Sequence, residues 1–271
     1  MTETLNGKTL IASHRGAAGG NIPFNTTPAF ECALRQKADI LELDVSKSLD
    51  GTLYVFHPKL EPVFLGSKKL ISEMHDDEVA LQRNRNTDQA PTQYGVERLE
   101  PVLENLRGRC RINIDKFWVA PLEIAALVRG MGMQDQVIVK SNLSAETVKD
   151  AAEYASDLPY MPIVRETDTT DEFMTGYRGR WVGVETCFSS EENESGTEAF
   201  VRKMHDAGRL VWVNAIVYNY KKVLSGGHND DLAAAGDMDG SWGWLAKRGY
   251  DIVQTDFPLL LHTYLTEKGY R

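Results

Sequence analysis

Cysteine is scarce in this sequence, and no long apolar run is present. The chain of 271 residues holds three cysteines, Cys32, Cys110 and Cys187, which lie far apart. An odd, widely spaced set is not typical of a disulfide framework or a metal-binding knuckle, so we expect a reducing compartment and a cytoplasmic protein. No apolar stretch approaches the ~20 residues that a membrane-spanning helix needs, so no transmembrane segment is expected.

The first residues and the charge balance exclude two further classes. The start, MTETLNGKTLIASHRG, lacks a basic region followed by a long apolar core, so no signal peptide is expected. Lys and Arg number 30 against 39 Asp and Glu, and the net charge of −9 argues against a nucleic-acid partner. A small phosphate ligand stays compatible with an acidic chain, because a single site can be positive or hold a metal ion.

What the sequence does contain is a regular alternation of short apolar strands with helix-like stretches. The helix-like stretches include residues 27–37, 119–130, 144–155 and 196–207. The expected strands are residues 9–13, 39–45, 53–57, 111–115, 137–141, 160–164, 181–185, 210–216 and 251–256. A strand followed by a helix, repeated along the chain, predicts parallel strands joined by crossover helices.

Two of these strands, residues 39–45 and 53–57, depart from the alternation. Only seven residues, with Asp50 and Gly51 among them, separate the two, whereas a parallel crossover needs about a dozen residues or more. The pair is therefore predicted to be a hairpin or one extended strand, and counting it once leaves eight strands. Eight strands with alternating helices predict an α/β fold, the TIM (β/α)₈ barrel. A doubly wound sheet is the competitor, but no GxGxxG motif follows the first strand.

The domain organisation is expected to be simple. No linker or low-complexity segment divides the chain, so residues 1–271 are predicted to form a single barrel domain. The longest stretch without a strand signal, residues 58–98, is rich in polar residues and is expected to be a small insertion after the hairpin. Because it starts directly after His57, it could cover the mouth of the barrel, or it could pack on the outer helices.

The strand ILELDV, residues 40–45, places two acids inside an apolar run. Side chains alternate across a strand, so Glu42 and Asp44 point the same way and their apolar neighbours point the other way. In a barrel the two acids would face the axis near the C-terminal mouth, where barrel enzymes keep their chemistry. A bound cation would offset their repulsion and desolvation. The alternative is that each acid is solvated at a strand end or paired with an arginine.

Other strand ends supply further polar side chains. His14 and Arg15 follow the first strand, His57 ends LYVFH, and Asp115 ends RINID. The carboxyl ends of parallel barrel strands meet at one mouth, so these side chains are predicted to converge there with the two acids. Scattered solvated residues would not produce such clustering.

Three carboxylates and two histidines suggest two separate roles, metal binding and proton transfer. Carboxylates are hard oxygen ligands that suit one divalent cation, Mg²⁺ or Ca²⁺, better than zinc; a zinc site that uses the histidines is the less favoured alternative. Histidines left free can move protons near neutral pH. A metal ion, an arginine and two histidines together fit phosphoryl chemistry, with the cations on the nonbridging oxygens.

Taken together, these residues resemble the glycerophosphodiester phosphodiesterase family. The similarity rests on SHRG, the ELDV strand, DGTLYVFH, LEPVLENL, INID and the terminal GYDIVQTDFP, which occur in the same order and span nearly the whole chain. The combination of HRG, ExD, DG and H at these spacings is specific. The resemblance implies a TIM barrel that uses a divalent metal ion to hydrolyse phosphodiesters of glycerol, often the deacylated headgroups of phospholipids.

The resemblance also implies a role for each matching position. It makes His14 and His57 the acid and base, Arg15 a phosphate contact, and Glu42, Asp44 and Asp115 the metal ligands.

Three positions depart from the family's pattern. The family has Pro-Glu-Asn-Thr after the first strand, whereas Phe24 replaces the Glu here. The third metal ligand is often Glu in the family and is the shorter Asp115 here. The family also has a lysine two residues after that ligand, where this chain has Phe117 and carries Lys116 one residue early. On a regular strand Lys116 would point away from the mouth, and only a bulge would return it to the site.

Later strand ends carry weaker signals. Lys140, at the end of VIVK, is an alternative phosphate contact to Lys116. Glu185 ends the strand WVGVE and shares a mouth position. Trp212 is expected in the core, because aromatic residues prefer burial, or else as a wall of the substrate pocket. Asp256, at the end of the last strand, is expected to make a structural hydrogen bond.

Three functions remain open from the sequence. The leading expectation is metal-dependent hydrolysis of a glycerophosphodiester, a small-molecule substrate, to an alcohol and a phosphomonoester such as glycerol 3-phosphate. A phospholipase-type lyase would use the same residues but would let a substrate hydroxyl attack phosphorus and release a cyclic phosphate. A barrel that binds a phosphorylated metabolite without catalysis is the third, and the presence of both histidines and all three acids counts against it.

Overall fold

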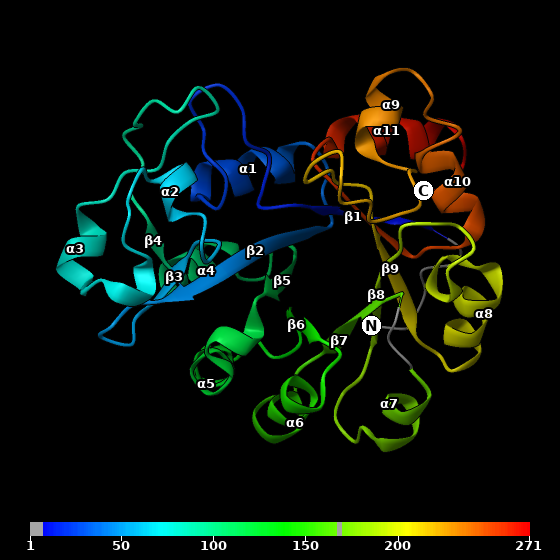
Figure 1. Cartoon of the computed structure of the whole chain (residues 1–271), viewed down its shortest axis with the longest axis horizontal. Helices are drawn as coiled ribbons and strands as arrows, with labels where there is room; N and C mark the ends of the chain where they lie inside the picture. Colours follow the sequence, from blue (N-terminus) through cyan, green and yellow to red (C-terminus); the bar gives the residue numbers. More distant parts are fainter. Residues whose placement is uncertain (1–7, 167–169) are drawn as a thin grey trace.

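A computed structural model describes residues 8–166 and 170–271, and its centre is a closed barrel of eight parallel strands (Figure 1). The sheet closes because β1 pairs in parallel with both β10 and β2. The barrel strands are β1 (Leu10–Ser13), β2 (Ile40–Lys47), β5 (Arg111–Asp115), β6 (Val137–Asn142), β7 (Tyr160–Arg165), β8 (Gly183–Cys187), β9 (Leu210–Asn214) and β10 (Ile252–Thr255). The predicted TIM barrel is therefore confirmed. The strand predicted at residues 181–185 is observed at Gly183–Cys187, so its bounds lie two residues further along the chain. Because side chains alternate with a period of two, the same residues still point toward the barrel axis.

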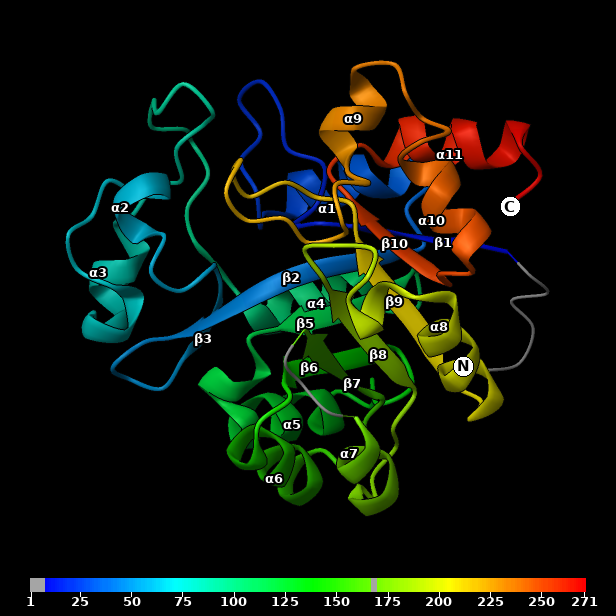
Figure 2. The same cartoon turned by 45° about the vertical axis from the view of Figure 1, so that its right-hand side comes forward.

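Helices surround the barrel between successive strands (Figure 2). They are α1 (Thr27–Arg35), α4 (Leu99–Leu106), α5 (Pro121–Gly130), α6 (Ala145–Tyr154), α7 (Asp171–Gly176), α8 (Glu198–Asp206), α9 (Asp230–Ala234), α10 (Trp242–Arg248) and α11 (Pro258–Glu267), with the short 3-10 turns η2 (Phe117–Val119) and η3 (Glu194–Gly196). Local sequence fixes several helix starts. Ser144 caps α6 by accepting a hydrogen bond from the N–H of Thr147, and proline stands in the first turn of α1, α5 and α11. Within the described part of the chain, no helix has the length and apolar character that would let it span a membrane.

Strand β2 shows how the alternating pattern divides the core. Leu41, Leu43 and Val45 are buried in the outer core between the strands and the helices. Ile40 points the other way and belongs to a layer that fills the barrel interior. This interior layer consists of Ala12, Ile40, Ile138, Met161, Val182, Leu210, Trp212 and Ile252. The barrel is thus closed from within by apolar side chains, and polar groups can occupy only its ends.

The predicted hairpin is present and carries the insertion. Strand β2 runs beyond the barrel and pairs antiparallel with β3 (Leu53–Val55), which pairs with β4 (Glu97–Arg98). Between β3 and β4 the chain forms α2 (Glu61–Phe64), η1 (Ile71–Glu73) and α3 (Asp76–Ala80). A small separate core holds this region against the hairpin, namely Tyr54, Phe56, Leu65, Ile71, Met74 and Val79. In Figure 1 the insertion, in cyan, lies to one side of the barrel at the tip of the hairpin.

Candidate active site

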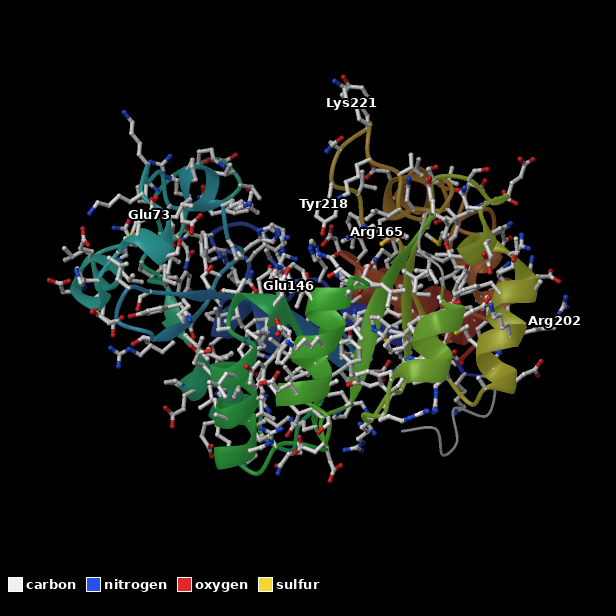
Figure 3. The ribbon with its side chains drawn as sticks, turned by 60° about the horizontal axis from the view of Figure 1, so that its bottom comes forward. Glu73, Glu146, Arg165, Arg202, Tyr218 and Lys221 are labelled. Carbon is white, nitrogen blue, oxygen red and sulfur yellow. The ribbon has the colours of Figure 1, made fainter. Side chains whose placement is uncertain are left out.

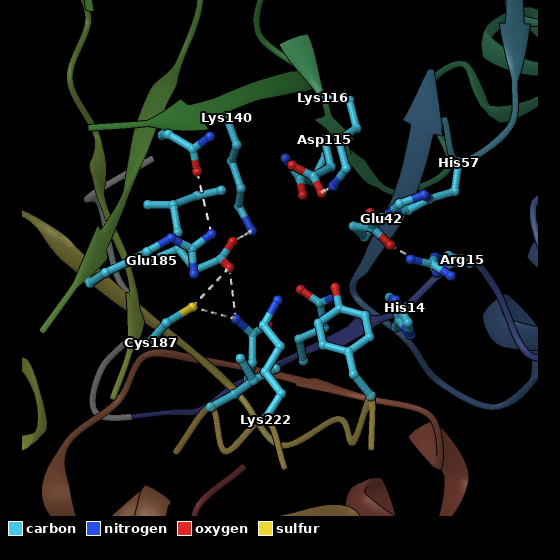
Figure 4. Close-up of a pocket in the computed structure, with 18 of the residues that line it drawn as sticks. His14, Arg15, Glu42, His57, Asp115, Lys116, Lys140, Glu185, Cys187 and Lys222 are labelled. Carbon is cyan, nitrogen blue, oxygen red and sulfur yellow. Dashed lines mark hydrogen bonds and ion pairs between the residues drawn. The ribbon is translucent and has the colours of Figure 1, made fainter. Parts of the chain in front are cut away.

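A polar layer lies directly above the apolar interior layer. Several strands place a polar residue two positions after an interior apolar one: His14 after Ala12, Glu42 after Ile40, Lys140 after Ile138, Asn214 after Trp212 and Gln254 after Ile252. The two-residue period of a strand makes these side chains point toward the barrel axis, one level nearer the C-terminal mouth. They form the floor of a cavity of about 520 Å³, which Figure 4 shows from close by.

The three predicted acids meet at one side of this cavity. Glu42, Asp44 and Asp115 each offer a carboxylate oxygen, and these oxygens lie within 4.8 Å of one another. Glu42 and Asp44 are buried, and one oxygen each of Asp44 and Asp115 is buried without a hydrogen-bond partner. Burial, together with the charges of the two neighbouring acids, raises the pKa of Glu42 well above its ordinary value. Three crowded carboxylates with free lone pairs fit a hard divalent cation.

Arg15 contacts two of these acids and has an unusual backbone conformation. It has a φ of 56°, and its own N–H donates to Oε2 of Glu42 at 2.9 Å. Its guanidinium Nε lies 2.8 Å from Oδ2 of Asp44. Burial would raise the pKa of Asp44, but the charges of Arg15 and Lys116 outweigh it and hold that pKa well below the usual value. Asp44 therefore stays ionised while Glu42 resists ionisation, an imbalance that a bound cation would relieve.

The motif HRG also requires its glycine. Gly16 has a φ of +78°, and a Cβ atom there would come within 2.7 Å of the backbone of Ala29 in α1. The glycine lets the chain turn sharply after Arg15 and pass close to the helix. Asn25, from the same loop, donates from Nδ2 to Oδ2 of Asp44 at 2.9 Å and accepts the N–H of that residue at 3.2 Å. The loop after β1 thus supports the acids as well as supplying His14 and Arg15.

Lys116 lies in the site. It was expected to point away from the mouth if the strand stayed regular, but the strand ends before it. Strand β5 ends at Asp115, and Lys116 adopts a left-handed φ of 61° that reverses the direction of its side chain. Its ammonium group contacts Asp115 and lies 3.6 Å from Oδ1 of Asp44. Phe117, which occupies the family's lysine position, is fully buried in the outer core. The left-handed conformation of Lys116 thus brings a lysine into the site, although this lysine stands one residue earlier than the family's.

His14 is held by a carboxylate from the opposite end of the chain. Its Nδ1 lies 2.9 Å from Oδ1 of Asp256, while its Nε2 is buried and has no hydrogen-bond partner. The backbone N–H of Asp256 donates to Oδ2 of the buried Asp230 at 2.8 Å. The ring of Tyr218 meets the His14 ring edge-on at 6.1 Å. Asp256 therefore makes a hydrogen bond, as expected, and its partner is a candidate catalytic side chain.

His57 reaches the acids because the hairpin folds back toward the mouth. The N–H of Phe56 donates to the carbonyl oxygen of Asp44 at 3.1 Å, which places the next residue beside that acid. The Nδ1 atom of His57 is 2.8 Å from the carbonyl oxygen of Pro58, so it carries the proton. Its Nε2 lies 3.9 Å from Oδ1 of Asp44. Burial and the charges of Arg15 and Lys116 lower the pKa of His57 against the pull of Asp44, which favours a neutral ring with a basic Nε2.

The other side of the cavity holds a second charged group (Figure 4). Lys140 is almost fully buried, and its Nζ lies 2.6 Å from Oε2 of Glu185. Asn214 donates to the second oxygen of that carboxylate at 2.7 Å. Trp212 is fully buried in the interior layer, with its ring 3.0 Å from Nζ of Lys140, so it is part of the core beneath the cavity rather than a wall of it.

Several residues of the site were missed by the sequence analysis. They are Asn25, Arg165, Tyr218, Lys222 and Asp230. Arg165 could have been found, because it follows Ile163 and Met161 on the inward face of β7 at the same two-residue spacing. Tyr218 and Lys222 lie on the loop after β9, where no strand period indicates a direction. Asp230 begins a helix and gives no local signal of its link to Asp256.

Phe24, in place of the family's glutamate, faces the insertion. Its ring contacts those of Phe64 at 6.1 Å and His14 at 6.4 Å. From the insertion, Leu60 lines the main cavity, and Phe64 lines a small adjoining cleft with His57. The insertion therefore touches the edge of the site at a few apolar residues, while most of it packs on the hairpin.

Comparisons of the sequence give one match over most of the chain and shorter ones to named phosphodiesterases. The chain is 26% identical over 206 residues to the uncharacterized protein YqiK of Bacillus subtilis strain 168, a match that covers 65% of this chain and 84% of that protein. A glycerophosphodiester phosphodiesterase of Caldanaerobacter subterraneus subsp. tengcongensis is 48% identical over 50 residues, which are 18% of this chain and 20% of that one. A family model described as a domain of unknown function matches residues 160–265.

Solved structures extend the likeness to the whole chain. A glycerophosphodiester phosphodiesterase from Agrobacterium tumefaciens strain C58 is 26% identical with a TM-score of 0.71, covering 94% of this chain and 99% of that one. A glycerophosphoryl diester phosphodiesterase from Parabacteroides distasonis has a TM-score of 0.77 at 17% identity, with coverage of 96% and 87%. An Oleispira antarctica phosphodiesterase, solved with the product sn-glycerol-3-phosphate, has a TM-score of 0.68 at 19% identity, with coverage of 96% and 97%. The predicted resemblance to the glycerophosphodiester phosphodiesterases is confirmed.

Proposed function

We propose that the chain hydrolyses a glycerophosphodiester to an alcohol and a phosphomonoester such as glycerol 3-phosphate. The observation that carries the proposal is the meeting of three carboxylates, two of them buried, with Arg15 and two histidines at the mouth of one barrel. Supporting it, the Oleispira antarctica phosphodiesterase of the same fold was solved with sn-glycerol-3-phosphate as its product. The three cysteines are free, which agrees with a reducing, cytoplasmic setting.

Glu42, Asp44 and Asp115 would hold one divalent cation, Mg²⁺ or Ca²⁺. When bound, such an ion supplies positive charge that draws electron density from the phosphate and stabilises the transition state. In the chain itself, Arg15 and Lys116 bring two further positive charges to the same acids. These side chains would bind the nonbridging oxygens of the phosphate, with Lys140 as a further contact from the opposite wall.

The two histidines differ in their hydrogen bonds, and the difference suggests their roles. His57 donates from Nδ1 to Pro58 and presents a basic Nε2, so it would take the proton from the attacking water. His14 has its Nδ1 against Asp256 and its Nε2 without a partner at the cavity, so it would give a proton from Nε2 to the departing alcohol. After this step His57 holds the proton taken from water and His14 has lost one, so proton exchange with solvent must return both rings to their starting states before the next turnover.

The experiment is a test of turnover with matched variants. The protein should hydrolyse bis(4-nitrophenyl) phosphate and glycerophosphodiesters with Mg²⁺ or Ca²⁺ present, and excess EDTA should stop both reactions. Glu42→Gln should lose the metal-supported rate, while Glu100→Gln, an exposed acid on α4, should keep it. Hydrolysis that continues unchanged in EDTA or in Glu42→Gln would refute the metal-dependent mechanism.

The same assay separates the alternatives through its products. Hydrolysis gives an open phosphomonoester from the first turnover, whereas a lyase would give a cyclic phosphate, and ³¹P NMR distinguishes the two. A protein that binds phosphodiesters but turns over none of them would be the non-catalytic barrel.

A further inference from the structure

Tyr218 lines the cavity, but the mechanism proposed above gives it no part. It stands on the loop between β9 and α9, residues 215–229. His14, Arg15 and Lys116 line the same cavity from the loops that follow β1 and β5. Tyr218 therefore lies among the groups that are proposed to handle the phosphate and the protons.

The loop that carries Tyr218 is a folded segment with a turn of its own. Directly after Tyr218, the side chain of Asn219 accepts a hydrogen bond from the N–H of Lys221 at 2.9 Å, a contact typical of an Asn that begins a turn. The returning part of the loop is held by the N–H of Phe188, after β8, which donates to the carbonyl oxygen of Leu224 at 2.9 Å. In Figure 3 Lys221 points outward from the tip of this loop, whereas Tyr218 lies nearer the barrel. The turn thus separates an outward side chain from one that reaches the cavity.

Two contacts orient the ring of Tyr218 at the edge of the cavity. It meets the ring of His14 edge-on, with 6.1 Å between the centroids and 84° between the planes. The ammonium group of Lys222 lies 4.7 Å from the centroid of the Tyr218 ring. Tyr218 is 43% exposed, so one part of it faces solvent while another part lies in the cavity.

The hydroxyl group of Tyr218 is the part that lies among the charged groups of the site. Burial raises the pKa of Tyr218 well above its usual value. The charges of Arg15 and Lys116 lower this pKa, and those of Asp115 and Glu42 raise it, so the hydroxyl oxygen is near both cations and both acids. Within the described part of the chain, no group forms a hydrogen bond with this hydroxyl. Its hydrogen is therefore available to a ligand.

We infer that Tyr218 is a further catalytic residue, whose hydroxyl donates a hydrogen bond to a nonbridging oxygen of the substrate phosphate. Arg15 and Lys116 are proposed to bind these oxygens, and the hydroxyl lies beside the same two side chains. A hydrogen bond to an anionic oxygen is stronger than one between neutral groups, and it gains strength as negative charge develops in the transition state. The inference rests on the proposed phosphodiesterase function and adds a substrate contact to it.

Other roles suit this hydroxyl less well. A phenol keeps its proton at neutral pH, so it does not act as a general base there. The three carboxylates are stronger ligands for a hard cation than a neutral phenol oxygen is. Donation to the phosphate needs neither a change of protonation nor a place among the metal ligands.

The test removes the oxygen and keeps the ring. Tyr218→Phe should lower kcat/KM for bis(4-nitrophenyl) phosphate and for a glycerophosphodiester by roughly 10- to 100-fold, the range expected for a lost hydrogen bond to a charged group. Tyr220→Phe is the matched control, because Tyr220 lies on the same loop and is 87% exposed. This control should keep the parent's kcat/KM, and both variants should keep the parent's melting temperature.

Binding of the product tests the same contact without turnover. With Mg²⁺ or Ca²⁺ present, calorimetric titration with glycerol 3-phosphate should show about tenfold weaker binding to Tyr218→Phe than to the parent. Binding of the metal ion alone should be the same in the two proteins. If Tyr218→Phe loses affinity for the ion as well, the hydroxyl serves the metal site and the inference is overturned.

The failure of this inference can be distinguished from that of the proposed function. If the parent hydrolyses bis(4-nitrophenyl) phosphate and Tyr218→Phe does so equally well, the hydroxyl makes no such contact and the phosphodiesterase function stands. If Tyr218→Phe keeps the rate and Tyr218→Ala loses it, the ring is only a wall of the cavity, and the inference is again wrong. If the parent hydrolyses no diester under any condition, the proposed function falls and the inference falls with it.

Discussion

His14 and Asp256, from the two ends of the barrel sequence, are joined by a contact of 2.9 Å between Nδ1 and Oδ1. They are neighbours because β1 and β10 are adjacent parallel strands whose ends meet at the mouth. The backbone N–H of Asp256 is in turn bound by Asp230 at 2.8 Å. His14 is thus oriented by a chain of two carboxylates, and its Nε2 is left to face the cavity.

The first prediction concerns Asp256 as a positioning residue. Asp256→Asn keeps the size of the side chain but removes the negative charge beside Nδ1 of His14. We expect kcat to fall roughly 10- to 100-fold, with a smaller change in KM, because outer partners that orient a functional imidazole typically have effects of this size. Steady-state kinetics on a glycerophosphodiester provides the measurement.

The chain offers a matched control for this change. His75 and Asp50 form a similar pair, Nδ1 to Oδ1 at 2.8 Å, but on the exposed surface of the insertion region. Asp50→Asn should leave kcat unchanged. A normal kcat in Asp256→Asn, with folding intact, would show that the His14–Asp256 contact is only structural.

The second prediction tests whether the two histidines act as one unit. His14→Ala and His57→Ala should each reduce kcat by roughly 10²- to 10⁴-fold, because each removes one proton-transfer group. The double variant should be little worse than either single variant, since loss of one step already limits turnover. His262→Ala, on α11, serves as the control and should retain the parent's rate. Losses that multiply in the double variant would mean that the histidines work independently.

Side-chain alternation explains what could be predicted from the sequence. In ILELDV the apolar and acidic residues separate onto two faces, and the structure places Leu41 and Leu43 outside and Glu42 and Asp44 inside. The eight-strand count depended on the same reasoning, because only a short link could make residues 39–57 a hairpin. Regular strands carry directional information in their sequence, and the predicted site residues all lay on or just after strands.

The positions that sequence reasoning missed depend on irregular backbone and distant contacts. Lys116 reaches the acids through a left-handed turn that strand periodicity cannot reveal. Asp230 acts through a bond to Asp256, 26 residues away, and nothing in its local sequence indicates that partner. Lys222 lies on a loop whose direction is set by packing after β9. Conformations of this kind are held by the surrounding tertiary structure rather than by local preference.

The third prediction concerns the effect of Glu42 on the stability of the metal-free protein. Burial and the neighbouring acids raise the pKa of Glu42, so the folded state holds a proton that the unfolded chain releases as pH rises. The free energy of unfolding of metal-free protein therefore falls as pH rises above the ordinary range for Glu, and Glu42→Gln removes that cost. In EDTA at pH 7 we expect the variant to melt at a higher temperature than the parent.

Added metal should reverse that order. Mg²⁺ or Ca²⁺ should raise the melting temperature of the parent, because an ion that binds only the folded state stabilises it. Glu42→Gln should gain little, and Glu100→Gln should behave like the parent in both conditions. Equal gains in the parent and in Glu42→Gln would place the ion elsewhere.

The last prediction concerns Asp230, whose carboxylate is buried beneath the site. It accepts hydrogen bonds from Trp242 Nε1 at 2.8 Å, Thr255 Oγ1 at 2.9 Å and the N–H of Asp256. Burial raises its pKa to about 7 in spite of these bonds. Between about pH 4, where an unfolded Asp ionises, and pH 7, the folded state binds more protons than the unfolded chain, so stability falls as pH rises.

Chemical denaturation at pH 5 and pH 8 can isolate this contribution. From pH 5 to pH 8 the parent should lose about 2 kcal/mol more free energy of unfolding than Asp230→Asn, because the variant has no carboxyl group to titrate there and all other groups are shared. The exposed neighbour provides the control, since Asp231→Asn on α9 should keep the parent's pH dependence.

Asp230→Asn should also lower kcat, because an amide N–H would face the N–H of Asp256 and displace the residue that orients His14. If the free energy of unfolding depends on pH in the same way in the parent and in Asp230→Asn, the buried Asp230 carboxyl group does not titrate in this range. An unchanged kcat in Asp230→Asn would show that Asp230 does not help to position His14.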